Sequence, residues 1–310
     1  MEQSPNFKIL VVGYGSIGQR HTRVLQELGY PVAIVSRHSR NYSPCYPNLE
    51  EALLDWNPDY VVIANRTNEH YRSLAILAEK QFKGRVLIEK PLFAKYIDVP
   101  QHQFAHVAVA YNLRFHPLLQ QLKSIITNSP KVISVHIYTG SYLPNWRSTT
   151  DYRQSYSALT EQGGGVLRDL SHELDYVQWI FGDWKRLTAI GGKFSDLAIT
   201  SDDVYSILME TEKAFLVSIH MNYLDKIPRR EIIVNVSDQT IQVDLINNSI
   251  TIDGHKNVIN HNRDATYIAE HQAMIVGHRS ILCTLKEASQ TLETIEMAEK
   301  AATLNTWIQQ

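Results

Sequence analysis

A glycine-rich segment at residues 13–18, Gly-Tyr-Gly-Ser-Ile-Gly, is the first part of the sequence with a chemical signature. It follows an apolar run and opens a helix-compatible stretch. Glycines at this spacing permit a tight turn, close approach of the backbone to a pyrophosphate and close helix–strand packing, while the helix N-terminus offers free N–H groups to phosphates. At the start of a strand–helix–strand unit, the motif predicts dinucleotide binding rather than an ordinary turn. The expected contacts are Gly13, Gly15, Ser16, Ile17 and Gly18.

The residues after the second apolar run bear on the choice of dinucleotide. An acid about 20 residues beyond the glycine segment would bind the ribose 2′-hydroxyl of NAD, whereas an arginine suits the 2′-phosphate of NADP. No acid occurs there, and Ser36, Arg37 and Arg40 are present instead. The sequence therefore favours NADP(H) over NAD(H), with a solvated basic loop as the alternative.

The fourth apolar run leads into Glu89-Lys90-Pro91. Ligands of open parallel sheets sit beyond the carboxyl ends of the strands, so Lys90 is expected beside the cofactor. A lysine close to a cationic nicotinamide has its charged form disfavoured, which suits it to proton transfer near neutral pH. A surface lysine at a strand end is the alternative.

A helix expected near residues 165–181 groups polar side chains on one face. At about 100° per residue, Asp169, His172, Glu173 and Tyr176 share that face. Several hydrogen-bonding groups with one titratable imidazole are what a sugar site needs. A solvated face is the alternative. Asp175 points elsewhere on the wheel, and the chain has only two cysteines, so no metal site is expected.

The segment 142–156 is rich in aromatic residues and arginines. Aromatic faces can pack on sugar or base rings, and arginines bind phosphate or carboxylate in a bidentate manner. The segment therefore predicts recognition of a large, charged sugar such as a nucleotide-sugar, or else a loop packed on the domain surface. The expected substrate contacts are Trp146, Arg147, Tyr152, Arg153 and Tyr156, with Tyr176 from the helix and with Arg114 and His116, which follow the fifth apolar run.

Two patterns of elements would position these residues. Up to residue 115, five continuously apolar runs alternate with helical stretches, which indicates an α/β domain with a doubly wound parallel sheet. The connection 91–103 lacks a convincing helix. From residue 116, strands with period-two alternation predict an α+β domain with an open-faced, mostly antiparallel sheet. We therefore expect an NAD(P)-binding Rossmann domain at 1–115 and a substrate-binding and oligomerisation domain at 116–310. The apolar runs are 9–12, 32–35, 60–64, 86–88 and 106–111, and the helices between them are 17–28, 49–56 and 69–81.

Composition excludes several classes of protein. The 310 residues are 44% hydrophobic and 20% charged, with a formal net charge of −2. This balance argues against a disordered chain and against a general nucleic-acid binder, which carries a basic surplus. No stretch reaches the ~18 apolar residues of a membrane-spanning helix, and the first residues do not look like a signal peptide. We expect a cytoplasmic protein with neither nucleic-acid nor membrane partners.

Taken in order, five motifs resemble the Gfo/Idh/MocA oxidoreductases, the family of glucose–fructose oxidoreductase and inositol dehydrogenase. They are the glycine segment at 13–18, Ala-Asn-Arg-Thr-Asn-Glu-His at 64–70, Glu-Lys-Pro at 89–91, Tyr-Asn-Leu-Arg-Phe-His-Pro at 111–117 and Gly-Gly-Gly-Val-Leu-Arg-Asp at 163–169. The resemblance covers essentially the whole chain. It implies a Rossmann domain followed by an α/β domain with an open-faced sheet.

The resemblance also implies roles for individual residues. Lys90 would be the acid/base group, and Asp169 would contact a sugar or polyol substrate. The family places a helper histidine four residues after this aspartate, where the present chain has Glu173. His172, three residues on, is the expected partner of Lys90, with Glu173 as the alternative. The implied cofactor contacts are Ala64, Asn65, Arg66, His70, Glu89, Lys90 and Asn112, although Arg66-Thr67 departs from the usual Thr-Pro.

These features predict an oxidoreductase that transfers a hydride between a nicotinamide and a secondary hydroxyl or ketone of a sugar or nucleotide-sugar. A reductase of a C=N or C=C bond on the same scaffold, or a non-catalytic dinucleotide-binding sensor, are the alternatives. A large apolar sheet face seldom stays in water, so a homodimer or homotetramer through the C-terminal sheet is expected.

Overall fold

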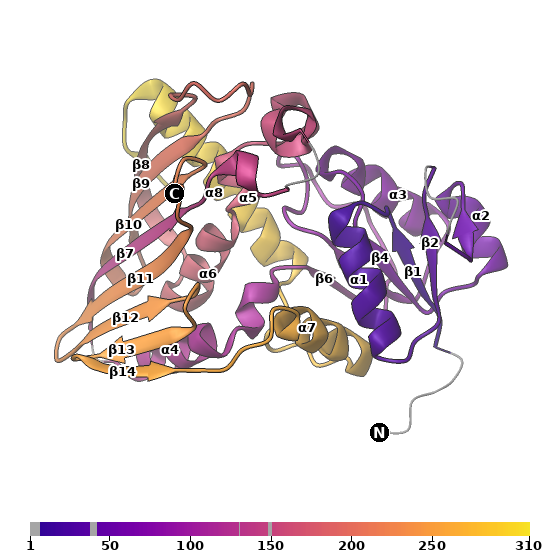
Figure 1. Cartoon of the computed structure of the whole chain (residues 1–310), viewed down its shortest axis with the longest axis horizontal. Coiled ribbons are helices and arrows are strands. Elements are labelled where there is room, and N and C mark those ends of the chain that lie inside the picture. Colours follow the sequence, from indigo (N-terminus) through magenta and orange to yellow (C-terminus); the bar gives the residue numbers. More distant parts are fainter. Residues whose placement is uncertain (1–6, 38–41, 130, 148–150) are drawn as a thin grey trace. The chain divides into compact units, whose positions relative to one another are not determined.

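The computed structural model (Figure 1) describes residues 7–37, 42–129, 131–147 and 151–310. Arg40, expected at the cofactor, and the first six residues of the chain lie outside these ranges. The contacts divide the chain into two compact units. The first comprises Met1–Phe115 with Arg263–Ser289, and the second comprises His116–Asn262 with Gln290–Gln310.

The first unit is built on a six-stranded parallel sheet with the order β3-β2-β1-β4-β5-β6. Its inner strands are buried on both faces, as their continuous apolar sequences require. The predicted doubly wound parallel sheet is confirmed. Its strands are β1 (Ile9–Val12), β2 (Val32–Val35), β3 (Cys45–Tyr46), β4 (Tyr60–Ile63), β5 (Arg85–Ile88) and β6 (His106–Val109).

Two details of this sheet differ from the sequence prediction. Strand β3 was not expected, because two residues carry no periodic signal. The last apolar run leaves the sheet at Val109 and continues into a 3₁₀ helix, η2 (Asn112–Phe115). The connection between β5 and β6 contains no helix, as predicted. The helices that cover the sheet are α1 (Ser16–Glu27), α2 (Leu49–Asp55) and α3 (His70–Glu79), the last preceded by the 3₁₀ turn η1 (Thr67–Glu69).

A late helix, α7 (Ala265–Val276), belongs to the first unit rather than to the second, where the domain prediction placed it. It lies beside α1 in Figure 1, and Arg23 of α1 is paired with Asp264 at its N-terminus. Buried Thr266 of α7 also accepts a hydrogen bond from Asn112 of η2. These are long-range contacts, and no local pattern in the sequence reveals them.

The second unit carries a nine-stranded sheet with the order β14-β13-β12-β11-β7-β10-β9-β8-β15. Every pair of neighbours is antiparallel except β7 with β10. The predicted mostly antiparallel sheet is therefore confirmed. Its strands are β7 (Val132–Gly140), β8 (Trp184–Gly192), β9 (Val204–Thr211), β10 (Ala214–Asn222), β11 (Arg229–Val236), β12 (Thr240–Asp244), β13 (Ser249–Ile252), β14 (His255–Val258) and β15 (Ile308–Gln309).

Helices lie along one face of this sheet and leave the other face open (Figure 1). They are α4 (Pro117–Asn128), α5 (Val166–Asp169), α6 (His172–Phe181) and most of α8 (Leu285–Leu304). Exposed apolar side chains on the strands include Ile133, Ile190, Leu208, Phe215 and Leu216. Within the described ranges, no helix has both the length and the apolarity to cross a membrane.

Candidate active site

The glycine segment forms the turn from β1 to α1, and its three glycines have different steric environments. Gly13 has a φ of +98°, and a Cβ there would lie 2.6 Å from the backbone N of Asn65. A Cβ on Gly18 would lie 2.1 Å from the carbonyl oxygen of Gly13. A Cβ on Gly15 would meet nothing within 4 Å. The first and last glycines are therefore required by packing, while the middle one leaves open space.

This open space lies at the N-terminus of α1. Gly15 is the N-cap residue, no side chain caps the helix, and the first turn contains no acidic residue. Ser16 is exposed and Ile17 is half-buried. The helix end therefore presents backbone N–H groups and the positive end of the helix dipole to solvent, which suits a phosphate group. These residues fit a dinucleotide.

At the end of β2, Ser36 is half-buried and Arg37 is exposed. The Arg37 guanidinium lies 3.6 Å from the Glu69 carboxylate, which comes from η1 after β4. An acidic group, that of Glu69, therefore lies beside Arg37, although it comes from another segment. The sequence prediction missed it because it considered only the residues after β2.

The loops after β4 and β5 are tied together by His70. Its ring is buried. Nδ1 lies 3.1 Å from the carbonyl oxygen of Pro91 and 3.2 Å from that of Leu92. Nε2 lies 3.2 Å from the carbonyl oxygen of Asn65. Burial lowers the pKa of this imidazole. Of its expected neighbours at the cofactor, Ala64 is buried, Asn65 is half-buried and Arg66 is exposed. The His70 ring therefore lies between the backbone segments that follow β4 and β5.

Glu89 and Lys90 follow β5 directly. The Glu89 carboxylate is buried, faces His21 Nε2 at 2.8 Å and accepts the backbone N–H of Lys90 at 3.0 Å. Lys90 itself is half-buried. Since β1 and β5 are parallel strands of one sheet, Lys90 and the glycine segment both lie at the carboxyl edge, where ligands of such sheets bind.

In the second unit, Asp169 ends α5 and is 6% exposed. The Tyr223 hydroxyl donates to its Oδ2 at 2.7 Å, and the Tyr156 hydroxyl is also hydrogen-bonded to it. Burial, followed by the charge of Asp169, raises the pKa of both phenols well above the usual value. Both hydroxyls therefore remain protonated and can donate to the carboxylate.

The single polar helix face expected around Asp169 is wrong, because the helix breaks after this residue. Helix α5 ends at Asp169 and α6 begins at His172, so one helical wheel does not describe both. Glu173 is fully buried, and Arg230 binds both of its carboxylate oxygens at 2.7 and 3.0 Å. Thr139 and Tyr176 also donate to it, at 2.8 and 3.5 Å. His172 is half-buried and is the more accessible of the two candidates.

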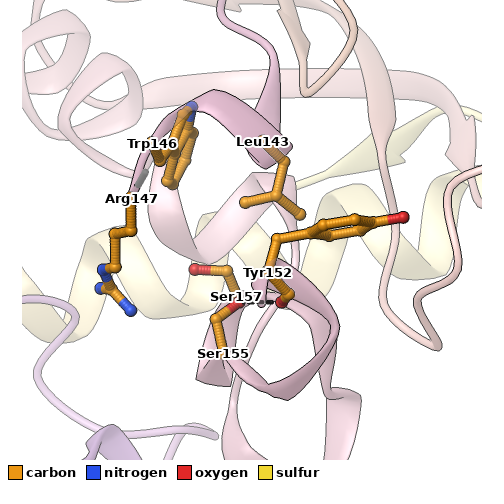
Figure 2. A pocket seen from close by; sticks show the side chains of 6 residues that line it. All are labelled: Leu143, Trp146, Arg147, Tyr152, Ser155 and Ser157. Carbon is orange, nitrogen blue, oxygen red and sulfur yellow. Dashed lines mark hydrogen bonds between the residues drawn. The ribbon is translucent and has the colours of Figure 1, made fainter. Parts of the chain in front are cut away.

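A pocket of about 220 Å³, a volume that includes space open to solvent, lies beside the stretch of chain that carries Tyr156. Figure 2 shows Trp146 and Arg147 on one side of it and Leu143 and Tyr152 on the other. Ser155 and Ser157 complete the lining. Three of the expected substrate contacts therefore come together in one pocket, lined by aromatic, cationic and hydroxyl groups.

Two tyrosines connect Asp169 to residues that line the pocket. The Trp146 ring meets Tyr223 edge to face at a centroid distance of 5.2 Å. The Arg147 guanidinium lies 5.6 Å from the centroid of the Tyr156 ring. Tyr156 and Tyr223, which both bind Asp169, therefore each contact Asp169 on one side and a residue of the pocket lining on the other. Tyr223 was missed in the sequence because a tyrosine at a strand end carries no local functional signal.

Other expected substrate contacts have side chains that are engaged elsewhere. Arg114 is buried and paired with Glu287 at 2.9 Å, and the exposed Arg153 forms a bidentate pair with Asp151. Tyr176 is fully buried beside Glu173. Buried His116 caps α4 by accepting the N–H of Leu118 at 3.3 Å. These four residues do not line the pocket. Three of them are buried within their own unit, and the fourth, Arg153, is held by Asp151 at the surface.

Family models match both halves of the chain. Residues 7–106 match a model described as the oxidoreductase family with an NAD-binding Rossmann fold. Residues 129–243 match the Gfo/Idh/MocA C-terminal domain. The chain belongs to the Gfo/Idh/MocA oxidoreductase family. The predicted family is therefore confirmed, and residues 7–106 match the NAD-binding Rossmann fold of that family.

A curated relative and solved structures agree with this membership. The chain is 30% identical over 213 residues to an uncharacterized oxidoreductase of Synechocystis sp.. That match covers 61% of this chain and 55% of the relative, so the chain spans about half the length of the relative it matches.

The structural similarities cover almost all of both chains. Levoglucosan dehydrogenase in complex with NADH and L-sorbose has a TM-score of 0.82 at 13% identity, with 98% of each chain covered. The WlbA dehydrogenase of Bordetella pertussis, in complex with NADH and UDP-GlcNAcA, has a TM-score of 0.80 at 16% identity, with 99% of this chain and 98% of that chain covered. At such identities these similarities show a common Gfo/Idh/MocA fold.

Proposed function

We propose that this protein is an NAD(P)-dependent dehydrogenase of a sugar or nucleotide-sugar. The observation that carries the proposal is the position of Lys90 at the carboxyl end of β5, on the sheet edge that also presents the glycine segment. A nicotinamide dinucleotide would supply the hydride acceptor or donor. Its phosphates would be held by the turn from Gly13 to Gly18 and by the N-terminus of α1.

The proposed chemistry moves one hydride and one proton. As the carbinol carbon of the substrate loses its hydride, the hydroxyl proton passes to the amine of Lys90, and the alcohol becomes a ketone. Proton transfer by a positioned side chain contributes about 10²–10⁴-fold to such rates. We assign the assisting role to His172 rather than Glu173, because Arg230 binds both carboxylate oxygens of Glu173.

Asp169 is proposed to orient the sugar. Its carboxylate can accept hydrogen bonds from substrate hydroxyls while Tyr156 and Tyr223 hold it in place. Trp146 offers a flat apolar surface for a ring, and Arg147 offers a guanidinium for a phosphate or carboxylate. This combination favours a charged sugar, and a relative of the same fold was solved with UDP-GlcNAcA.

The cofactor preference and the assembly are further parts of the proposal. Arg37 supports NADP(H) over NAD(H), although the relatives named above were solved with NADH. Equilibrium titration decides between the two, and tighter binding of NADH than of NADPH would overturn the preference. Exposed Ile190, Leu208 and Leu216, which alternate with buried residues along their strands, support a homodimer or homotetramer. A monomer in light scattering at micromolar concentration would contradict that assembly. We also place the protein in the cytoplasm, which cell fractionation can test.

The central test is the variant Lys90→Met, with the exposed Lys95→Met as its matched control. Lys90→Met should abolish turnover while NAD(P)H still binds in a fluorescence titration, and Lys95→Met should retain both. Near-normal turnover of Lys90→Met would contradict the mechanism.

The substrate is found by screening the wild-type protein with both cofactors. The panel contains sugars, nucleotide-sugars and ketosugars together with substrates that carry C=N or C=C bonds. Turnover only of the unsaturated compounds would identify a reductase instead. No turnover with any compound, together with tight cofactor binding, would favour a sensor.

A further inference from the structure

Four buried side chains from four elements of the first unit form a continuous hydrogen-bonded chain. Glu89, after β5, faces Nε2 of His21 on α1 at 2.8 Å. Nδ1 of His21 faces Nε2 of His271 on α7 at 2.8 Å. Nδ1 of His271 faces the hydroxyl of Tyr60 on β4 at 2.9 Å. His21, His271 and Tyr60 are fully buried, and Glu89 is 8% exposed. The proposed reaction does not itself use His21, His271 or Tyr60.

The geometry restricts where the protons of this chain can lie. A carboxylate only accepts hydrogen bonds, so His21 must carry a proton on Nε2. A neutral imidazole has one donor and one acceptor, so Nδ1 of a neutral His21 accepts from Nε2–H of His271. Nδ1 of a neutral His271 then accepts from the Tyr60 hydroxyl. In this arrangement every polar atom along the chain is satisfied, and every donor points toward Glu89.

The surroundings favour neutral groups at the far end of the chain. Burial, and then the neighbouring His21, lowers the pKa of His271 well below the usual value. Burial, and then the charge of Glu270, raises the pKa of Tyr60 well above the usual value. Tyr60 therefore remains a phenol that can donate, and His271 remains an imidazole that can accept.

Other charged or titratable groups surround this hydrogen-bonded chain of side chains. Tyr267 of α7 packs edge-on against the His21 ring, at a centroid distance of 5.6 Å. Arg20 of α1 lies over the Tyr267 ring, with its Cζ 5.1 Å from the ring centroid. Arg85 of β5 and Glu270 of α7 act on Tyr60 electrostatically.

We propose that His21 and His271, with Tyr60 as the terminal donor, are positioning residues for Lys90. They act through Glu89, whose other oxygen accepts the backbone N–H of Lys90 at 3.0 Å. With one oxygen fixed by His21 and the other by this N–H, the carboxylate has one orientation, and the backbone that carries Lys90 is held against it. The proposal rests on the proposed function, in which Lys90 moves the substrate proton.

The arrangement also explains why a late segment of the chain belongs to the first unit. Helix α7 contributes the central histidine, so Arg263–Ser289 completes a support beneath Glu89 that the first 115 residues do not contain. Without His271, Nδ1 of His21 would lose its donor in a fully buried site. A buried acceptor without a donor is unfavourable, so His21 would reorient and release Glu89.

The first test reads the protons directly and needs no activity. Ring ¹⁵N chemical shifts of histidine-labelled protein at neutral pH are assigned with the variants His21→Gln and His271→Gln. We expect both residues to be neutral with the proton on Nε2. An imidazolium at His21, or a proton on Nδ1 of His271, would overturn the proposed direction of the chain.

The second test measures catalysis in His21→Leu, His271→Leu and Tyr60→Phe. We expect kcat to fall by about tenfold to a hundredfold in the histidine variants, as for small misplacements of a catalytic group, with little change in the Kd of the cofactor. His21→Gln, which can still donate to Glu89, should recover most of the loss. Trp56→Phe, which removes a hydrogen bond to the carbonyl of Ile9 and part of the ring, is the control for simple destabilisation.

The outcomes separate this inference from the proposed function. If the histidine variants retain wild-type kcat while Lys90→Met is inactive, the positioning role is wrong and the proposed function stands. If Lys90→Met is itself active, the proposed function fails. The ¹⁵N shifts still decide whether the donors of the hydrogen-bonded side chains point toward Glu89. Should the leucine variants fail to fold, Tyr60→Phe provides the comparison, because it removes the donor to Nδ1 of His271. A kcat of Tyr60→Phe equal to that of the wild type would then contradict the positioning role.

Discussion

Arg230 holds Glu173 through both carboxylate oxygens, with Nε and Nη2 of the guanidinium at 2.7 and 3.0 Å. The carboxylate is completely buried at the start of α6, while the guanidinium on β11 is partly exposed. The pair therefore joins a helix to the sheet behind it. Its geometry gives Glu173 a structural role, which supports the proposed assignment of the assisting role to His172.

The first prediction is that breaking this pair destabilises the protein strongly. Arg230→Met leaves the Glu173 charge buried without its partner, which should lower the free energy of unfolding by about 3–5 kcal/mol. Urea denaturation measures the change. The matched control is Arg186→Met, which breaks the exposed pair with Glu210 at 2.9 Å and should cost at most about 1 kcal/mol.

The double variant Arg230→Met/Glu173→Gln separates the structural role of Glu173 from a catalytic one. It removes the buried charge together with its partner, so it should recover part of the lost stability and retain turnover at a temperature where it is folded. A folded but inactive double variant would indicate that Glu173, and not His172, assists Lys90.

The second prediction concerns the support of Asp169. Tyr223→Phe removes the hydroxyl that donates to Asp169 at 2.7 Å but keeps the ring that meets Trp146. Hydrogen bonds to charged groups contribute about 1.5–3 kcal/mol, so kcat/KM for the sugar should fall by about tenfold to a hundredfold. Steady-state kinetics measure this change, with KM carrying most of it if Asp169 orients the sugar.

A matched control is available on another carboxylate of the same unit. Tyr138→Phe removes a hydroxyl that donates to Asp225 at 3.2 Å and should leave kcat/KM within about twofold of the wild-type value, as expected for a change that touches no substrate group. Equal losses in the two variants would show that Tyr223 matters only for general stability.

Local features of the site could be predicted from the sequence, and long-range contacts could not. The glycine segment and Glu89-Lys90-Pro91 lie at strand ends, so the apolar runs before them located both at the sheet edge. Tyr223 and Arg230 reach Asp169 and Glu173 across 54 and 57 residues. Such contacts depend on the pairing of strands, which one sequence does not reveal.

Periodicity was also misleading where the backbone changes direction. The residues from Gly165 to Phe181 have the apolar spacing of one helix, yet the helix breaks between Asp169 and His172. A wheel drawn through that break assigned Glu173 and Tyr176 to an open face, although both are buried. The break places Asp169 beside two tyrosines and leaves His172 at the start of a new helix.

The third prediction concerns the cofactor. Arg37→Ala should weaken NADPH binding by about tenfold while changing NADH binding little, because a charged hydrogen bond to a 2′-phosphate is worth about 1.5–3 kcal/mol. Glu69→Gln removes the partner of Arg37 and should strengthen NADPH binding by about two- to fivefold, the range for an exposed ion pair. Fluorescence titration of the wild type and both variants with NADPH and with NADH gives the dissociation constants.

Arg72→Ala is the control for the removal of an exposed positive charge from the same unit. It should not weaken the binding of NADPH more than that of NADH. If Arg37→Ala affects NADH and NADPH equally, Arg37 does not recognise the 2′-phosphate, and the preference for NADP(H) loses its main support.

The fourth prediction is an acid sensitivity centred on His116. Burial, and then the nearby His261, lowers the pKa of His116 to about 4 from the ordinary 6.5. As the pH falls below 6.5, the unfolded chain binds a proton that the folded chain does not bind until about pH 4. Stability is therefore full above pH 6.5 and is lost across this interval, by about 2 kcal/mol at pH 5.

The variant His116→Asn tests this cause, because asparagine is a good N-cap residue that does not titrate. The difference in the free energy of unfolding between pH 7.5 and pH 5 should shrink by about 2 kcal/mol relative to wild type. His255→Asn, on the exposed strand β14, should leave the difference unchanged. Since His116 caps α4 and also faces Asn248 at 3.3 Å, its protonation would disturb the start of that helix. The same pH dependence in His116→Asn and wild type would show that another group controls acid unfolding.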